Sequence, residues 1–174
     1  RTLRINLLAA ATVAHFMHIP NKHIEKIMAT FTGVPHRLEP VVTLQGVDYV
    51  NDSKATNIDS VKVALDSFNK SIILILGGQY KGGNFKKLLP HANNIKAVLA
   101  YGQAHQTIET ALGDAVRLYI FDNLKDAVSK SQSLASPGDI VLLSPGCASF
   151  DQFDNFEHRG DLFKQWVSQL EEQK

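Results

Sequence analysis

The sequence predicts an α/β protein with a Rossmann-like, doubly wound and mostly parallel sheet, which has an N-terminal hairpin and is preceded by two helices. Two observations support this prediction. Continuous apolar runs, such as residues 72–76 and 140–143, are typical of parallel strands that are covered on both faces. Such runs alternate with segments of helical periodicity, which indicates successive βαβ units.

Residues 1–34 contain helical patterns but no strand. Apolar side chains recur at helical spacing over residues 5–17, and Pro20-Asn21 predicts the start of a second helix with Asn21 as its cap. This second helix is expected to end at Gly33, with an apolar face made of Ile24, Ile27, Met28 and Phe31. Because two helices alone cannot enclose a core, we expect residues 1–34 to be the end of another domain.

The pattern changes after this helical segment, at a linker with two prolines. Residues 41–44 and 47–51 predict a hairpin. The elements expected after it are a helix at 57–68, a strand at 72–76, a helix near 84–91, a strand at 96–101, a helix at 104–112, a strand at 116–121, a helix at 124–135, a strand at 140–144 and a helix at 160–172. Thr56 or Asn57, and Asn123, are suitable helix caps. The alternation predicts one domain over residues 35–174.

Composition limits the classes of function. The 174 residues suffice for one domain and a piece of another, and 44% hydrophobic with 20% charged residues is typical of a globular protein. The net charge of +1 gives no general attraction to nucleic acid or membranes, and no apolar run is long enough for a membrane span. A single cysteine excludes an intrachain disulfide and agrees with a reducing compartment. Since the chain starts at Arg1 in a helical pattern, we expect a segment of a longer protein.

The loop at residues 144–153 (SPGCASFDQF) is the most informative feature. It follows an apolar strand, and open α/β sheets bind ligands at the carboxyl ends of their strands. Ser144, Ser149 and nearby N–H groups suit a carboxylate, and the pocket is expected to be walled by Phe150, Phe153 and Phe156. Cys147 has no histidine beside it, which favours a buried thiol over a nucleophile.

Two further loops follow predicted strands. In residues 51–57 (NDSKATN), Lys54 and exposed N–H groups suit an anion, and Asp52 suits a ribose or a magnesium-bound phosphate. A polar turn with a helix cap is the simpler alternative. Residues 77–85 (GGQYKGGNF) combine four glycines with Lys81, but the spacing of a Walker loop is absent.

The fourth cluster is His36-Arg37, at the expected junction between the domains. A fixed arginine there can grip a phosphate or carboxylate with two hydrogen bonds, although a solvated linker pair is equally compatible. The seven histidines show no metal-ligand spacing, so no metal site is predicted. His91, His105 and His158 are interpreted as surface or capping residues.

These four clusters, in this order, resemble the Mur ligases, and specifically those that add D-glutamate in peptidoglycan synthesis. The matching segments are residues 33–39 (GVPHRLE), 51–57, Gly77-Gly78 with Lys81, 143–153, 155–157 (NFE) and Arg159-Gly160. The resemblance covers essentially the whole chain. It implies an ATP-dependent amide ligase of three domains, in which residues 1–34 end the central ATP-binding domain and residues 35–174 form the C-terminal, D-glutamate-binding domain.

The resemblance also implies roles for individual residues. Thr56, Lys81, Ser149, Phe150 and Phe156 match positions that hold D-glutamate. The match places His36, Arg37 and Asp52 at the nucleotide, and it brings Lys54 close to the phosphate or substrate. No catalytic residue and no metal ligand is implied within this segment.

The cofactors and partners implied by the resemblance are ATP and Mg²⁺, D-glutamate, and UDP-N-acetylmuramoyl-L-alanine bound through other domains. No nucleic acid and no membrane insertion are implied, and the location is the bacterial cytoplasm. Because the phosphate loop and the metal ligands of the family fall outside this sequence, we expect the segment alone to be inactive.

Two other interpretations stay open from the sequence. One is a domain of another Mur-type or folylpolyglutamate-type ligase, which would share the fold but not the loop at 144–153. The other is a non-catalytic binding module built on a Rossmann-like sheet. Because the fold alone does not distinguish these functions, the loops must distinguish them.

Overall fold

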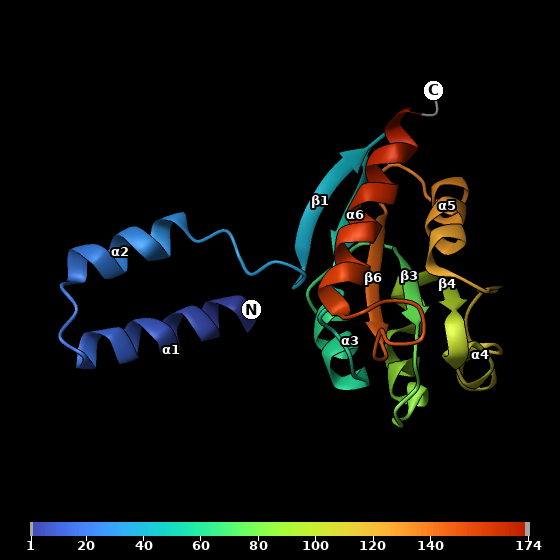
Figure 1. The fold of residues 1–174 in the computed structure, drawn as a ribbon, viewed down its shortest axis with the longest axis horizontal. Coiled ribbons are helices and arrows are strands. Elements are labelled where there is room, and N and C mark those ends of the chain that lie inside the picture. Colours follow the sequence, from blue (N-terminus) through green and yellow to red (C-terminus); the bar gives the residue numbers. More distant parts are fainter. Residues whose placement is uncertain (1, 173–174) are drawn as a thin grey trace. The chain divides into compact units, whose positions relative to one another are not determined.

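The computed structural model describes residues 2–172, and side chains from residue 6 to residue 171. The chain forms two compact units, which divide between Val34 and Pro35. Arg1 and Lys174, the outer ends of the two predicted domains, lie outside the described residues, and the side chain of Ile5 lies outside the described side chains. The sheet belongs entirely to the second unit (Figure 1).

The sheet has six strands in the order β1-β2-β6-β3-β4-β5. They are β1 (Glu39–Leu44), β2 (Val47–Asn51), β3 (Ile72–Gly77), β4 (Ile95–Tyr101), β5 (Leu118–Phe121) and β6 (Ile140–Gly146). β1 and β2 form the antiparallel hairpin, and every other pair in the sheet is parallel. The predicted mostly parallel sheet with an N-terminal hairpin is confirmed.

Helices cover both faces of this sheet, as Figure 1 shows. α3 (Ile58–Leu65), η1 (Phe85–Asn94) and α4 (His105–Leu112) contribute to one core, while α5 (Leu124–Leu134) and α6 (Phe156–Glu172) contribute to the other. β3 supplies both cores, because Leu74 points to the first and Ile75 to the second. Burial on both faces explains the continuous apolar run and confirms the doubly wound prediction.

Two elements differ most from the sequence prediction, and the bounds of the others shift by no more than three residues. The segment expected as a helix near 84–91 is the 3₁₀ helix η1, which contains Pro90 and therefore lacks one backbone donor. α6 begins at Phe156 instead of residue 160. The side chain of Asn155 accepts the N–H of His158 at 2.7 Å, which caps an additional turn.

The predicted caps have mixed outcomes. Asn57 accepts the N–H of Ser60 at 2.9 Å, and Asn123 accepts the N–H of Asp126 at 2.9 Å, so both are helix caps. The prediction for Asn21 is wrong, because the cap position of α2 (Asn21–Thr30) is Pro20 and no side chain caps this helix. The side chain of Pro20 has no acceptor, and its backbone carbonyl instead accepts the N–H of His23 at 2.9 Å.

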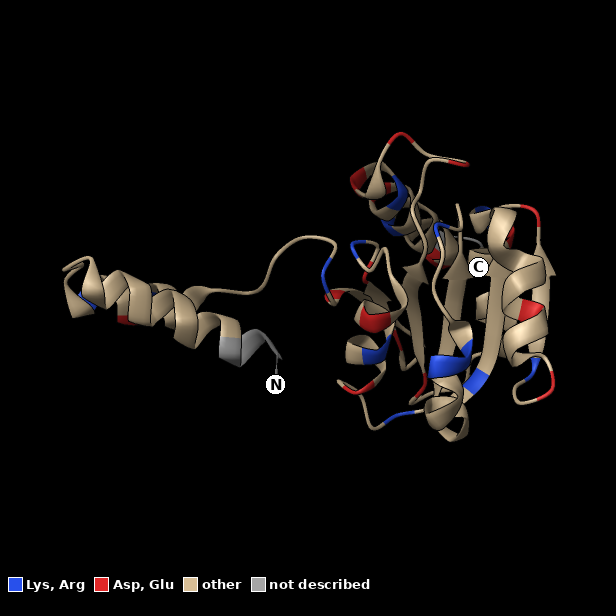
Figure 2. Ribbon diagram, turned by 90° about the horizontal axis from the view of Figure 1, so that it is seen from below, with Lys and Arg blue, Asp and Glu red and all other residues tan. Residues whose placement is uncertain are grey.

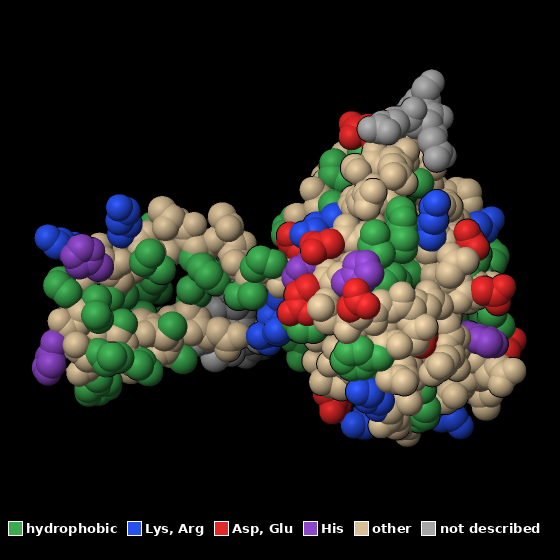
Figure 3. Space-filling view, in the orientation of Figure 1, with side chains coloured by type: hydrophobic (Ala, Val, Ile, Leu, Met, Phe, Trp, Pro, Cys, Tyr) green, Lys and Arg blue, Asp and Glu red, His purple; other side chains and the backbone are tan. Residues whose placement is uncertain are grey.

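The first unit is a pair of helices, α1 (Thr2–Phe16) and α2, that contact each other. No residue of α2 is buried, so its predicted apolar face is not covered within the described structure. Figure 3 shows apolar side chains gathered on this unit. The apolar side chains that are more than half exposed include Leu8, Val13, Phe16, Met17 and Ile27. Among the described residues, no helix is both long and apolar enough to cross a bilayer.

The surface of the second unit carries charges of both signs. Figure 2 shows lysine and arginine interspersed with aspartate and glutamate over its helices and loops. This distribution agrees with the net charge of +1.

Gly77 closes β3 where the backbone of β4 comes very close. Its φ is +140°, and a Cβ added there would lie 2.1 Å from the carbonyl oxygen of Tyr101. Gly82 also has a positive φ, +94°, but a Cβ added there would meet nothing within 4 Å beyond its chain neighbours. Comparing a substitution at Gly77 with one at Gly82 therefore separates the cost of a steric clash from the cost of the backbone conformation.

We expect Gly77→Ala to lower the free energy of unfolding by at least about 2 kcal/mol, because strand backbone must move, and Gly82→Ala by only about 1 kcal/mol. Urea unfolding followed by the fluorescence of Trp166, the only tryptophan of the chain, measures both. Equal losses in the two variants would contradict this account of Gly77.

Candidate functional site

The predicted binding residues lie on loops at the carboxyl edge of the sheet. β3 and β6 are neighbours in the sheet, but β3 leads to η1 on one face of the sheet and β6 leads to α6 on the other face. Such a switch point opens a crevice in which doubly wound proteins bind ligands. Thr56 follows β2, Lys81 follows β3 and Ser149 follows β6, so three loops from neighbouring strands meet at this edge.

Backbone hydrogen bonds fix these loops to one another. Gln79 and Ala148 exchange two hydrogen bonds, of 2.9 and 3.1 Å, which join the loops after β3 and β6. The N–H of Gly146 donates to the carbonyl of Ala55 at 2.8 Å, which joins the loops after β6 and β2. The neighbours of Lys81, Ser149 and Thr56 are therefore held in one rigid frame.

Two exposed lysines reach over phenylalanine rings at this edge. The ammonium of Lys81 lies 4.8 Å from the ring centre of Phe150, and that of Lys54 lies 4.3 Å from the ring centre of Phe156. Within the described part of the chain, neither ammonium has a carboxylate oxygen within 4.0 Å. Both positive charges are available to an anion, while the rings restrict their positions.

Asp52 and Ser144 form a buried pair beneath the loops. The Ser144 hydroxyl donates to Asp52 Oδ2 at 2.8 Å, and the N–H of Leu38 donates to Oδ1 at 3.1 Å. Burial raises the pKa of Asp52 to about 6, although these two hydrogen bonds and the charge of Arg37 oppose the shift. The expectation that Ser144 holds a ligand carboxylate is wrong, because its hydroxyl is fully buried and already donates to Asp52.

His36 is buried in a network that attaches the linker to α6. Asn51 Oδ1 accepts the N–H of Ser53, so Asn51 Nδ2 is the donor to His36 Nδ1 at 3.1 Å and to Glu39 at 3.0 Å. The neutral imidazole then carries its proton on Nε2, which lies 3.8 Å from Asp161 Oδ1. His36 thus fixes the linker from inside.

The imidazole of His36 lies against the backbone of α6 at Gly160, where no side chain is in its way. A Cβ added at Gly160 would lie 2.2 Å from His36 Nδ1, so only glycine fits at that position. Arg37, the next residue of the linker, is exposed. The two halves of the His36-Arg37 motif therefore differ in position, with the imidazole turned inward and the guanidinium accessible.

Arg159 is a central residue of the site that the sequence reasoning left without a role. Its side chain is fully buried, and its guanidinium donates to Ser53, Cys147, Ala148 and Tyr101. The helix predicted from residue 160 excluded it. With α6 starting at Phe156, Arg159 lies one turn before Phe163 on the same buried stripe, a signal that the correct helix start would have given.

The side chains of Phe153 and Cys147 lie in the interior of the protein. Phe153 is buried in the core with Trp166, so the prediction that it walls the ligand pocket is wrong. Cys147 is buried, and burial raises the pKa of its thiol to about 12. A thiol with so high a pKa is a poor nucleophile, which supports its packing role.

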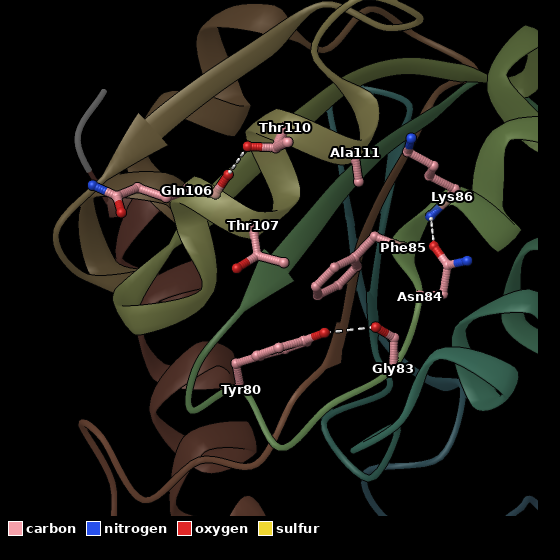
Figure 4. A pocket seen from close by; sticks show the side chains of 9 residues that line it. All are labelled: Tyr80, Gly83, Asn84, Phe85, Lys86, Gln106, Thr107, Thr110 and Ala111. Carbon is pink, nitrogen blue, oxygen red and sulfur yellow. Dashed lines mark hydrogen bonds between the residues drawn. The ribbon is translucent and has the colours of Figure 1, made fainter.

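An open pocket of about 440 Å³ lies beside the glycine-rich loop, as Figure 4 shows. It is lined by Tyr80, Gly83, Asn84, Phe85, Lys86, Gln106, Thr107, Thr110 and Ala111. None of the predicted site residues lines it. The roles predicted for Thr56, Lys81, Ser149, Phe150 and Phe156, and for His36, Arg37, Asp52 and Lys54, stay predictions.

The raised pKa of Asp52 predicts a pH-dependent cost of folding. The pKa of this carboxyl is about 6 in the folded chain and near 3.8 in the unfolded chain, so the fold loses stability as pH rises through this window. Asparagine cannot ionise. We therefore expect the free energy of unfolding of Asp52→Asn, relative to that of the unchanged chain, to rise by on the order of 2–3 kcal/mol between pH 4 and pH 7.5. Urea unfolding at both pH values measures this gain.

Asp48→Asn is the matched control with the opposite sign. Hydrogen bonds from Lys70 and Thr43 lower the pKa of Asp48, so its ionised form stabilises the fold as pH rises. The unchanged chain should therefore gain on this variant as pH rises through the range at and below 3.8, and the difference should stay nearly constant between pH 4 and pH 7.5. Parallel pH profiles for the two variants would contradict the burial account of Asp52.

Comparisons with known proteins agree with this loop arrangement. Residues 36–147 match the family described as Mur ligase, glutamate ligase domain. A UDP-N-acetylmuramoylalanine–D-glutamate ligase from Salinibacter ruber is 45% identical over 95% of this chain, and one from Bacillus subtilis is 43% identical over 95%. The chain spans 36% and 37% of these two relatives.

Solved structures show the same fold at low sequence identity. A UDP-N-acetylmuramate–alanine ligase from Thermotoga maritima aligns over 99% of this chain and 38% of its own, with a TM-score of 0.71 and 12% identity. A pseudomurein peptide ligase from Methanothermus fervidus aligns over 95% of this chain and 35% of its own, with a TM-score of 0.67 and 16% identity. Since the family match covers more than half of the residues and the curated relatives cover almost all of them, this chain belongs to the Mur ligase family.

Proposed function

We propose that the full-length protein is an ATP-dependent ligase that joins D-glutamate to UDP-N-acetylmuramoyl-L-alanine in bacterial peptidoglycan synthesis. The names of the Salinibacter ruber and Bacillus subtilis relatives support this substrate pair. The observation that carries the proposal is the backbone bridge between Gln79 and Ala148, which holds Lys81 and Ser149 on adjacent loops. As the reaction consumes ATP, we place it in the bacterial cytoplasm.

The reaction proceeds in two steps. An oxygen of the substrate carboxylate attacks the γ-phosphorus of ATP, which gives an acyl phosphate and ADP. The amine of D-glutamate then attacks the acyl carbon, and the tetrahedral intermediate loses a proton and inorganic phosphate to form the amide. Mg²⁺ supplies charge neutralisation in such transfers, and we propose that its ligands lie outside this segment.

The loops described above supply the D-glutamate site in this proposal. Lys81 pairs with a carboxylate of the amino acid, since its ammonium is exposed and has no described carboxylate partner. Thr56 and Ser149 donate hydroxyl hydrogen bonds to carboxylate oxygens. Phe150 and Phe156 cover the ligand and hold the lysines in place.

Arg37 is the nucleotide contact that the geometry favours. Its guanidinium is exposed, whereas His36 is buried against Asn51, and both oxygens of Asp52 already accept a hydrogen bond. We propose that Arg37 pairs with phosphate, that Asp52 offers a remaining lone pair to a ribose hydroxyl, and that His36 fixes the linker. Lys54, which has no carboxylate partner among the described residues and lies over the ring of Phe156, approaches the transferred phosphate.

The helix pair fits the end of the central ATP-binding domain. Its apolar side chains are exposed in the described structure, and the relatives are almost three times as long as this chain, so further chain is available to cover them. We propose that residues 2–34 pack against that domain and that residues 35–172 form the C-terminal domain.

Hydrogen exchange tests this assignment of the helix pair. We expect amides of α2 to be protected at least about a hundredfold more in the full-length protein than in the 174-residue chain, since burial suppresses local opening. Amides of β3, which is buried in both proteins, are the internal control. Equal protection of α2 in the two proteins would contradict the assignment.

Substitutions in the full-length enzyme test the D-glutamate site. We expect Lys81→Ala to raise the KM for D-glutamate by about tenfold to a hundredfold, and Ser149→Ala by about tenfold, because each removes a hydrogen bond to a charged ligand. Steady-state kinetics with ATP and the nucleotide substrate held at saturation measure both.

Lys86→Ala and Ser133→Ala are the matched controls, because both residues are exposed and neither belongs to the proposed site. An unchanged KM in both Lys81→Ala and Ser149→Ala would overturn the proposed roles. L-glutamate as the competing substrate separates this function from a folylpolyglutamate-type ligase, which is expected to lack the preference for the D-isomer.

A further inference from the structure

We infer that Arg159 is the positioning residue of the D-glutamate pocket, an inference that rests on the proposed function. Its guanidinium lies where the carboxyl ends of the strands meet and touches the loops that carry the proposed ligand contacts. It makes no contact with the ligand in this proposal. It acts through Thr56, Lys81 and Ser149, by fixing the backbone on which each of them stands.

The hydrogen bonds of Arg159 span the loops after β2 and β6. Nε donates to the Ser53 hydroxyl at 2.9 Å, and Nη2 donates to the Ser53 carbonyl at 2.8 Å. Nη1 donates to the carbonyls of Cys147 and Ala148, at 3.1 and 3.3 Å. One rigid, planar group therefore sets the separation of these two loops.

The same guanidinium contacts the end of β4 and lies near the residue that follows β3. Nη1 lies 3.5 Å from the hydroxyl of Tyr101 at the end of β4, and a Cβ added at Gly78 would lie 3.2 Å from Nη1. The Ser53 hydroxyl, which accepts from Arg159, donates in turn to the carbonyl of Phe156 at 2.8 Å. The start of α6 is thereby joined to the same network.

Each proposed D-glutamate contact is close in sequence to one of these bonded positions. Ser149 directly follows Ala148, and Thr56 stands three residues after Ser53. Lys81 stands two residues after Gln79, whose backbone exchanges hydrogen bonds with Ala148. A displacement of the guanidinium therefore moves several ligand contacts together. Misplacement of this kind, well below the size of a side chain, is enough to lose most of the affinity.

The partners of Arg159 are all neutral oxygens. Within residues 6–171, no carboxylate oxygen lies within 4.0 Å of its guanidinium. An ion pair would stabilise the charge with a single partner, whereas here the hydroxyl and carbonyl oxygens of several loops are needed. The interaction holds only when those loops are in their observed positions.

The experiment uses the full-length enzyme with Arg159→Lys, which keeps the charge but loses the planar set of donors. We expect the KM for D-glutamate to rise by about tenfold or more, with the KM for ATP changed by less than about threefold, because the hydrogen bonds of Asp52 do not involve Arg159. Arg117→Lys, at an exposed arginine, is the matched control and should change neither constant.

Ser53→Ala tests the same network if the lysine variant does not fold, since it removes one hydroxyl and leaves Arg159 in place. We expect a smaller rise in the KM for D-glutamate, of about threefold to fivefold. A purely structural role predicts a lower melting temperature and less active enzyme, with both KM values unchanged, and that result overturns the inference.

The inference and the proposed function fail in different ways. If Lys81→Ala and Ser149→Ala raise the KM for D-glutamate while Arg159→Lys and Ser53→Ala leave it unchanged, the positioning role is wrong and the function stands. If Lys81→Ala and Ser149→Ala have no effect, the proposed D-glutamate site itself is wrong.

Discussion

The burial of one positive charge is the constraint on which the site depends. Arg159 is fully buried, and an arginine does not lose its charge at any pH at which proteins fold. The cost of removing it from water must be offset by hydrogen bonds, and those come from Ser53, Cys147, Ala148 and Tyr101. Loops that are far apart in the sequence are thus required to converge on one point.

The parallel sheet makes this convergence possible. All strands except β1 end at the same edge, and β3 is flanked by β4 and β6. The loops after these three neighbouring strands therefore reach the same place. Glycine at residues 77 and 78 lets the backbones approach closely enough for the bridge between Gln79 and Ala148 to form. Sheet topology brings the loops together, and the guanidinium then sets their spacing.

The sequence was sufficient for the features that depend on local patterns. The apolar run at residues 72–76 predicted β3, and Asn57 and Asn123 predicted two helix caps, because strand burial and capping depend on neighbouring residues. The turn at the start of α6 was missed because Asn155 caps it from within a polar segment without helical periodicity.

Features that depend on distant partners were beyond the sequence. The commitment of Ser144 to Asp52 joins residues 92 positions apart, and the bonds of Arg159 to Ser53 join residues 106 positions apart. From composition alone, Ser144 and Ser149 were equivalent hydroxyls in one loop. Both are buried in the structure, but only the hydroxyl of Ser144 donates to a buried carboxylate.

The cations at the carboxyl edge of the sheet are divided by chemistry. Arginine offers five donors in a fixed plane, which suits a buried position with several neutral acceptors, and Arg159 uses them in this way. Lysine carries a compact charge on a flexible stem, and Lys54 and Lys81 are both exposed, each over a phenylalanine ring. Because the structural cation is already satisfied by neutral oxygens, the exposed lysines supply charge that an incoming anion can use. Under the proposed function, Lys81 takes a carboxylate of the amino acid and Lys54 takes the phosphate, and neither contact disturbs the guanidinium that holds the loops.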